Sequence, residues 1–127
     1  MISPPILPSL GIDLIEVDRI KKHLDDEAFL ERIFTESERR ECLRRAKPEE
    51  SLAARWAAKE AVAKALGCGI GEVGWKEIEV LGDEQHAPVL HLYGKAAQKA
   101  DELGLKNWSV SLSHSLSHAV AVVVAIG

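Results

Sequence analysis

Hydrophobic and polar positions along the chain predict a group of helices in its first half and a group of strands in its second. A short apolar run at residues 10–15 suits a strand, and helices are then predicted at residues 17–24, 28–33, 35–45 and 51–66. Further strands are predicted at 75–81, 88–93, 108–114 and 118–126, with one more helix at 95–103. Helices grouped early and an antiparallel sheet after them indicate an α+β fold, with the helices packed on a small sheet.

Local signals mark where several of these helices begin. Asp18 and Asp26 are of the residue type that caps a helix N-terminus. Thr35 and Glu38 have the spacing of a capping box, in which each side chain binds the other residue's backbone N–H. The helix at 51–66 is rich in alanine, the residue with the highest helix propensity, and is therefore the firmest of these assignments.

Composition and length restrict the class of protein. A chain of 127 residues is predicted to form one domain, 1–127, with a proline-bearing, non-helical lead-in at 1–9. Its net charge of -4 argues against general nucleic-acid binding, which needs a basic surface. The longest apolar run, 119–126, is far shorter than the roughly 20 residues of a membrane helix. Cys42 and Cys68 form no CxxC pair and have no nearby histidine at zinc-finger spacing, so a reduced, cytoplasmic location is expected.

Asp13 is the first residue whose type does not suit its predicted element. Aspartate is disfavoured within strands, yet Asp13 lies inside the apolar run at 10–15. It shares one face of that strand with Gly11 and Ile15. A solvent-facing strand position and a functional carboxylate are both consistent with this pattern.

Glu60 and Lys64 stand four residues apart on one face of the alanine-rich helix. The simplest interpretation is a surface ion pair that stabilises the helix by about 0.2–0.5 kcal/mol. The small apolar residues around them instead favour a central helix, whose charges then need partners. A carboxylate and a lysine on one buried face would suit a metal ion and a phosphate.

Magnesium is the metal that these residue types favour. It prefers oxygen ligands and keeps several waters, so one or two carboxylates together with substrate phosphates suffice to bind it. Asp13 and Glu60 could supply that pair from two separate elements, and Lys64 could neutralise phosphate charge. The sequence has no cluster of histidine and cysteine residues that would indicate zinc.

Two further polar features have simple structural explanations. His114 ends the strand at 108–114 on its apolar face, where a hydrogen-bonded core histidine is the commoner occurrence. The basic residues at 39–47 alternate with Glu36, Glu38 and Glu41, and this pattern is interpreted as a solvated helix face.

Three blocks of residues stand out together: Gly11-Ile12-Asp13 leading to Arg19-Ile20, Trp56-Ala57-Ala58-Lys59-Glu60-Ala61 continuing to Lys64-Ala65-Leu66-Gly67, and Val110-Ser111-Leu112-Ser113-His114-Ser115. These blocks resemble the bacterial holo-acyl-carrier-protein synthases of the phosphopantetheinyl transferase superfamily. Between the first two, Phe34-Thr35 and Glu38 match a short element of that family. The similarity runs from about residue 10 onward, and Trp56 stands where phenylalanine is more usual.

The resemblance implies the 4′-phosphopantetheinyl transferase fold and a magnesium-dependent reaction. The 4′-phosphopantetheine group of coenzyme A would pass to a serine of an acyl carrier protein of fatty-acid or polyketide synthesis, releasing adenosine 3′,5′-bisphosphate. Family members are typically homotrimers with active sites between subunits, and their partner is an acidic protein.

The resemblance also implies roles for individual residues. Asp13 and Glu60 would bind magnesium, with Glu60 the first candidate for general base, directly or through water. Lys64 would contact the phosphates of coenzyme A, and His114 would line the nucleotide pocket. Arg19 would meet the carrier protein. Two further candidates for the nucleotide pocket are Arg55 and Lys47.

Three other functions use some of the same residues. A non-catalytic module that binds coenzyme A or a nucleotide would explain Lys64 and His114 but would leave Asp13 and Glu60 without a role. A metal-dependent phosphohydrolase would use the same carboxylates with water as nucleophile. In a purely structural trimer, the central charges would be interface ion pairs.

Overall fold

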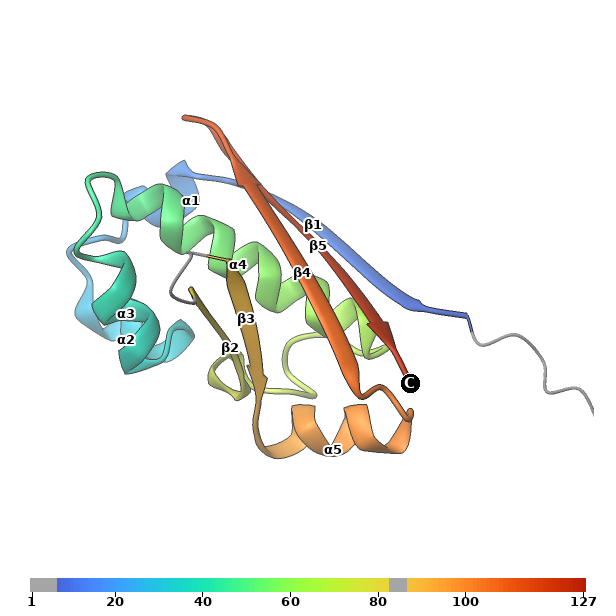
Figure 1. The fold of residues 1–127 in the computed structure, drawn as a ribbon. Coiled ribbons are helices and arrows are strands. Elements are labelled where there is room, and N and C mark those ends of the chain that lie inside the picture. Colours follow the sequence, from blue (N-terminus) through green and yellow to red (C-terminus); the bar gives the residue numbers. More distant parts are fainter. Residues whose placement is uncertain (1–6, 83–86) are drawn as a thin grey trace, which may run out of the picture.

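The computed structural model describes residues 7–82 and 87–127 (Figure 1). In chain order its elements are β1 (Ser9–Glu16), α1 (Asp18–Lys21), α2 (Glu27–Ile33), α3 (Glu36–Cys42), α4 (Pro48–Ala65), the 3-10 helix η1 (Trp75–Glu77), β2 (Ile78–Gly82), β3 (Pro88–Leu92), α5 (Gly94–Glu102), β4 (Asn107–His114) and β5 (His118–Ile126). The predicted α+β fold is confirmed. No helix in the described part of the chain is long and apolar enough to cross a membrane.

The strands form two antiparallel sheets. The larger has the order β1-β5-β4, so the last strand of the chain lies at its centre, and β2 pairs with β3 in a separate two-stranded sheet. Asp13 of β1 lies opposite Ala121 of β5, which in turn lies opposite Leu112 of β4. Helix α4 packs along β1 and β5 and also contacts β2 (Figure 1).

Helix α4 is buried on nearly all sides. Fourteen of its 18 residues are buried, as expected for a central helix whose alanines let neighbouring elements approach closely. It begins three residues before the predicted 51–66 range because Pro48 occupies its first turn, where no backbone N–H is needed. It ends at Ala65, and Gly67 follows with a φ of 74°, a left-handed conformation that favours glycine.

The backbone of β1 lies directly on α4 at Gly11. A Cβ at this position would lie 1.8 Å from the carbonyl oxygen of Ala61, so only glycine fits. Side chains fasten the two elements on either side of this contact. The Ser9 hydroxyl donates a hydrogen bond to the carbonyl of Ala65, and the Lys64 ammonium donates one of 2.9 Å to the carbonyl of Ile12.

A buried ion pair joins α3, α4 and β2. Lys59 and Glu38 are both fully buried, and Lys59 Nζ lies 2.7 Å from Glu38 Oε1. The ammonium also donates to the carbonyls of Trp75 and Ile78, and Glu38 Oε2 accepts a hydrogen bond of 2.9 Å from Val80 N–H. Burial lowers the pKa of Lys59, and the charge of Glu38 partly offsets that effect. The pair is thus satisfied by several hydrogen bonds, as a buried charge requires.

Two of the three predicted helix starts are confirmed. Asp26 caps α2 by accepting a hydrogen bond of 3.1 Å from Phe29 N–H. Thr35 and Glu38 form the reciprocal capping box of α3, with distances of 3.2 and 2.9 Å. The prediction for Asp18 is wrong. The N-cap of α1 is Val17, without a side-chain cap, and Asp18 is the first helical residue of a single short turn.

Several other boundaries differ from the predictions. The helix predicted at 35–45 ends at Cys42, and the strand predicted at 75–81 begins as η1 and becomes β2 only at Ile78. The Glu77 carboxylate accepts hydrogen bonds from the N–H groups of Gly74 and Lys95, which favours a turn over an extended strand there. Of the predicted lead-in at 1–9, residues 1–6 lie outside the described residues, and Ser9 already belongs to β1.

We expect Gly11→Ala to destabilise the fold by about 1–3 kcal/mol or more, because its Cβ would collide with the backbone of α4, which cannot rotate away. Gly69→Ala is the matched control. Its Cβ would meet nothing within 4 Å, so its free energy of unfolding should change by no more than about 0.5 kcal/mol. Urea unfolding measures both values, and equal stabilities for the two variants would contradict the close contact.

Candidate active site

Asp13, Glu60 and Lys64 are brought together where β1 lies on α4. Asp13 faces α4 with Gly11 and Ile15, and its side chain is 21% exposed. The solvent-facing alternative is therefore wrong, because Leu10, Ile12 and Leu14 occupy the outer face. Lys64 Nζ lies 3.2 Å from Asp13 Oδ1, so its ion pair is with β1 and not with Glu60.

The expectation that Glu60 and Lys64 share a buried face holds only in part. The Lys64 side chain is 53% exposed at the open edge of β1, whereas Glu60 is half-buried. Burial raises the pKa of Glu60, and the nearby charge of Asp13 raises it further. The side chains of Trp56, Lys64 and Arg19 act in the opposite direction. Two carboxylates that repel one another across this junction are a suitable setting for a cation.

The donor set fits magnesium better than a transition metal. Within residues 7–82 and 87–127 there is no group of three or more histidine, cysteine, aspartate or glutamate side chains that could hold a metal ion. Asp13 and Glu60 therefore form a pair of carboxylates without a third such side chain among the described residues. A magnesium ion needs no more than one or two carboxylates when substrate phosphates and waters complete its coordination.

A second polar site lies between α4 and β4. A cavity of about 260 Å³ is lined there by Arg45, Ser51, Arg55 and His114, among others. The Arg55 side chain is only 5% exposed, and its Nε has no hydrogen-bond partner among the described residues. Because buried N–H groups are almost always paired, this unpaired donor points to a ligand.

His114 lies at the rim of this cavity and not in the core. It follows the apolar face of β4, as predicted, but its side chain is 46% exposed because the strand runs beyond the packed layer. The expectation of a core histidine is therefore wrong. Its Nδ1 lies 3.4 Å from Glu50 Oε1.

The remaining predicted residues occupy separate positions. Lys47 is the exposed N-cap of α4 and is not among the residues that line the cavity. The Arg19 guanidinium lies 5.0 Å from the ring centroid of Trp56, one helical turn before Glu60, and is attracted to the aromatic face. Arg19 thus borders the carboxylate site.

The carboxylate site and the cavity lie on different sides of α4. Glu60 and Arg55 are five residues apart, which places them about 140° apart around the helix axis. Within one chain, α4 itself therefore separates Asp13, Glu60 and Lys64 from Arg55 and His114.

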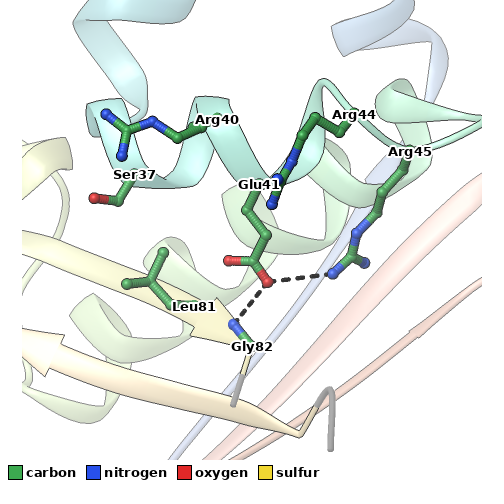
Figure 2. A pocket seen from close by; sticks show the side chains of 7 residues that line it. All are labelled: Ser37, Arg40, Glu41, Arg44, Arg45, Leu81 and Gly82. Atoms are coloured by element: carbon green, nitrogen blue, oxygen red, sulfur yellow. Dashed lines mark hydrogen bonds and ion pairs between the residues drawn. The ribbon is translucent and has the colours of Figure 1, made fainter. Parts of the chain in front are cut away.

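Sequence reasoning missed Glu41 and Arg45, and Figure 2 shows both at a surface cavity of about 470 Å³ between α3 and β2. The interpretation of the charged run at 36–47 as a solvated face is wrong for Glu41, whose side chain is 20% exposed, and for Glu38, which is fully buried. The capping box could have indicated that Glu41 is buried. It turns Glu38 inward, and a residue three positions later lies on the same helix face.

Comparison with known proteins identifies the family. The sequence model of the 4′-phosphopantetheinyl transferase superfamily matches residues 9–123. The chain belongs to this superfamily. It is 50% identical over 126 residues to the holo-[acyl-carrier-protein] synthase of Herpetosiphon aurantiacus, an alignment that covers 92% of this chain and 97% of the relative.

Solved structures of the superfamily share the fold. The holo-[acyl-carrier-protein] synthase of Helicobacter pylori, in complex with coenzyme A, superposes with a TM-score of 0.79 at 34% identity, covering 91% of this chain and 98% of that one. The enzyme of Bacillus anthracis, in complex with CoA (3′,5′-ADP), gives a TM-score of 0.77 at 39% identity, with coverages of 94% and 96%. The resemblance seen in the three sequence blocks is thereby confirmed.

The raised pKa of Glu60 predicts a stability cost at neutral pH. A carboxyl group whose pKa is higher in the folded state than in the unfolded state binds more protons when folded, so its contribution to stability falls as pH rises through that interval. We expect Glu60→Gln to stabilise the metal-free protein at about pH 7.5, by no more than about 1 kcal/mol because the group is partly exposed. The gain should shrink towards about pH 5.

Thermal unfolding in the presence of a chelator tests this expectation. Glu31→Gln is the control, since Glu31 is an exposed glutamate on α2 and should show no comparable gain at either pH. A Glu60→Gln protein less stable than the wild type at neutral pH would mean that the carboxylate is stabilised by its surroundings.

Proposed function

We propose that this protein is a holo-acyl-carrier-protein synthase that transfers 4′-phosphopantetheine from coenzyme A to a serine of an acyl carrier protein. The observation that carries the proposal is the junction of Asp13, Glu60 and Lys64, in a chain that belongs to the phosphopantetheinyl transferases. Relatives that bear the name holo-[acyl-carrier-protein] synthase, one of them solved in complex with coenzyme A, support it.

The proposed reaction is a displacement at phosphorus. The serine hydroxyl attacks the β-phosphorus of coenzyme A, the bond from that phosphorus to the bridging oxygen breaks, and adenosine 3′,5′-bisphosphate leaves with the electron pair. Glu60 accepts the serine proton, directly or through a water molecule. Lys64, exposed beside Asp13, binds a phosphate oxygen.

Magnesium would be held by Asp13 and Glu60. When bound, it would offset the charge of the pyrophosphate and of its transition state. The repulsion between the Asp13 and Glu60 carboxylates favours this assignment, because a divalent cation between them would attract both and offset that repulsion. Lys64 would then exchange its ion pair with Asp13 for contact with the substrate.

The cavity at Arg55 and His114 is proposed to take the anionic nucleotide end of coenzyme A. The unpaired Nε of Arg55 supports an anionic ligand there, and Lys47 at the start of α4 could reach the outer part of that ligand. Because α4 separates this cavity from Glu60 within one chain, we propose that a complete active site takes its two halves from neighbouring subunits of a homotrimer.

The outer face of the larger sheet supports such an assembly. Leu10, Ile12 and Leu14 of β1 are 62%, 59% and 65% exposed, and Val122 of β5 lies beside them opposite Ile12. Contiguous apolar side chains on an exposed face are typical of protein interfaces. Asp13 lies on the opposite, inner face of the same strand.

The acyl carrier protein is proposed to dock beside Trp56. Arg19 is held over the Trp56 ring, and Lys21 and Lys22 are exposed next to it, so this end of the molecule offers cations to an acidic partner despite the negative total charge. We also infer a cytoplasmic location, in agreement with two free cysteines, Cys42 and Cys68.

The intact mass of an apo-acyl carrier protein, measured after incubation with this protein, coenzyme A and magnesium, tests the reaction. We expect a gain of one phosphopantetheine that disappears with a chelator. Asp13→Asn and Glu60→Gln should reduce turnover by about a hundredfold or more, since each removes a charged group from the transition state. Glu102→Gln, at the exposed end of α5, should leave turnover unchanged.

The same assay separates the competing functions. Phosphopantetheine released without a carrier protein would indicate a phosphohydrolase, and coenzyme A binding without any transfer would indicate a binding module. Full activity of Glu60→Gln would mean that Glu60 has no catalytic role.

The proposed trimer predicts that Leu10→Lys yields single chains. A lysine on the apolar face would have to be desolvated at the interface, so the mass in solution should fall from three chains to one. Turnover should fall by about tenfold or more, because half of each site is lost. Light scattering after gel filtration measures the mass.

Leu103→Lys is the control, since Leu103 is 50% exposed at the end of α5 and is not part of the larger sheet. This change should leave both mass and turnover unchanged. A wild-type protein that is active as a single chain would refute the shared site.

A further inference from the structure

Glu41 gathers three donors on a single carboxylate oxygen. Its Oε1 accepts a hydrogen bond of 2.9 Å from Gly82 N–H and lies 3.3 Å from Arg45 Nη2 and 3.4 Å from Arg55 Nη2. Figure 2 shows Glu41 pointing away from α3 towards the end of β2, with Arg45 reaching back to it. One carboxylate therefore joins α3, α4, β2 and the segment between the two helices.

The two arginines that Glu41 holds both line the cavity that contains His114. Arg55 enters it from α4 and is 5% exposed at its side chain, whereas Arg45 is 37% exposed and also lines the cavity in Figure 2. Arg45 Nη1 makes one more hydrogen bond, of 3.3 Å, to the Ser51 hydroxyl. The guanidinium groups are thus fixed side by side before any ligand binds.

We infer that Glu41 is a positioning residue that presents Arg45 and Arg55 as a preformed pair to the anionic nucleotide end of coenzyme A. This inference rests on the proposed function. Two guanidinium groups near one oxygen repel each other unless a negative charge lies between them. Without that charge, the more exposed Arg45 would turn to solvent, and Arg55 would lose its salt bridge to α3.

The negative charge of Glu41 also has an opposing effect, because it weakens the attraction between the arginines and an incoming phosphate. That effect acts through the guanidinium groups at a longer distance and in a cavity open to water, where charges are screened. The repulsion between the arginines acts at short range in a largely buried place, so loss of the positioning effect is expected to dominate.

Glu41→Gln isolates the charge. The amide keeps the size of the side chain, and its oxygen can still accept the hydrogen bond from Gly82 N–H, so the fold should be retained. Its melting temperature should fall, because the buried Arg55 loses its charged partner. We expect the Kd and the KM for coenzyme A to rise about tenfold, the effect of losing one charge-assisted hydrogen bond, while kcat changes by less than about twofold. Glu41→Asp, which keeps the charge, should recover part of the affinity.

The matched control is Glu36→Gln on the same helix. Glu36 pairs with Arg40 at 2.8 Å, but both side chains are largely exposed, and neither contacts Arg45 or Arg55. Its Kd for coenzyme A should equal that of the wild type. In an Arg55→Met background, the effect of Glu41→Gln should shrink markedly, because Glu41 acts through the arginines.

Calorimetric binding of coenzyme A and the carrier-protein mass assay together decide the outcome. An unchanged or lower Kd in Glu41→Gln, or effects of Glu41→Gln and Arg55→Met that simply add, would overturn the positioning role. Such a result leaves the transferase proposal intact as long as the wild type modifies the carrier protein. A wild type that binds coenzyme A but transfers nothing would instead refute the proposed function.

Discussion

At Gly11 the backbone of β1 meets the backbone of α4 with no side chain between them, since a Cβ there would lie 1.8 Å from the carbonyl oxygen of Ala61. This contact sets the distance between the two elements that carry the candidate site. Asp13 is two residues further along the same face of β1, and Glu60 directly precedes Ala61. Lys64, one turn later, reaches both Asp13 and the Ile12 carbonyl. A wider separation would leave two distant carboxylates, each stable and neither suited to share a cation.

The charged side chains of α4 differ in how completely they are hydrogen-bonded, and the difference follows the direction in which each one points. Lys59 faces α3 and β2, where Glu38 and two backbone carbonyls satisfy it completely, so it stabilises the packing and is not available to a ligand. Glu60 and Arg55 are only partly satisfied. Glu60 lies near the like charge of Asp13, and the Nε of Arg55 has no hydrogen-bond partner among the described residues. Incomplete satisfaction is costly in a structural residue but useful in a binding residue. This contrast separates the structural lysine from the candidate functional pair.

Much of the fold could be predicted because its signals are local. The alanine content of α4 and the caps at Asp26 and Thr35 depend on neighbouring residues, and all three were predicted. Asp18 was misjudged because α1 is a single turn whose N-cap is Val17. Among the candidate site residues, sequence pattern identified the types and faces of Asp13 and Glu60 but not the partner of Lys64, which comes from a strand about 50 residues away.

Glu41 illustrates the same limit more sharply. Its neighbours alternate in charge, and that pattern by itself is typical of a solvated helix, yet β2, which buries it, is formed by residues some 40 positions later. The error at His114 was the opposite one. Its place on the apolar face of β4 was predicted correctly, but at the end of the strand the side chain is exposed and not buried. Burial is a property of the assembled elements, so charge and alternation patterns can only suggest it.

The position of α4 between the two polar sites gives the proposed trimer a physical reason. Coenzyme A carries its pyrophosphate and its nucleotide on one molecule, so a ligand bound at Glu60 would have to pass around α4 to reach Arg55 of the same chain. In the proposed trimer, a second chain docked on the apolar outer face of β1 would have to present its own Arg55 and His114 to Asp13 of the first. Assembly would then complete the site and cover the exposed leucine and isoleucine side chains at once. In that arrangement the exposed apolar face of β1 would form the interface and, by doing so, complete the site.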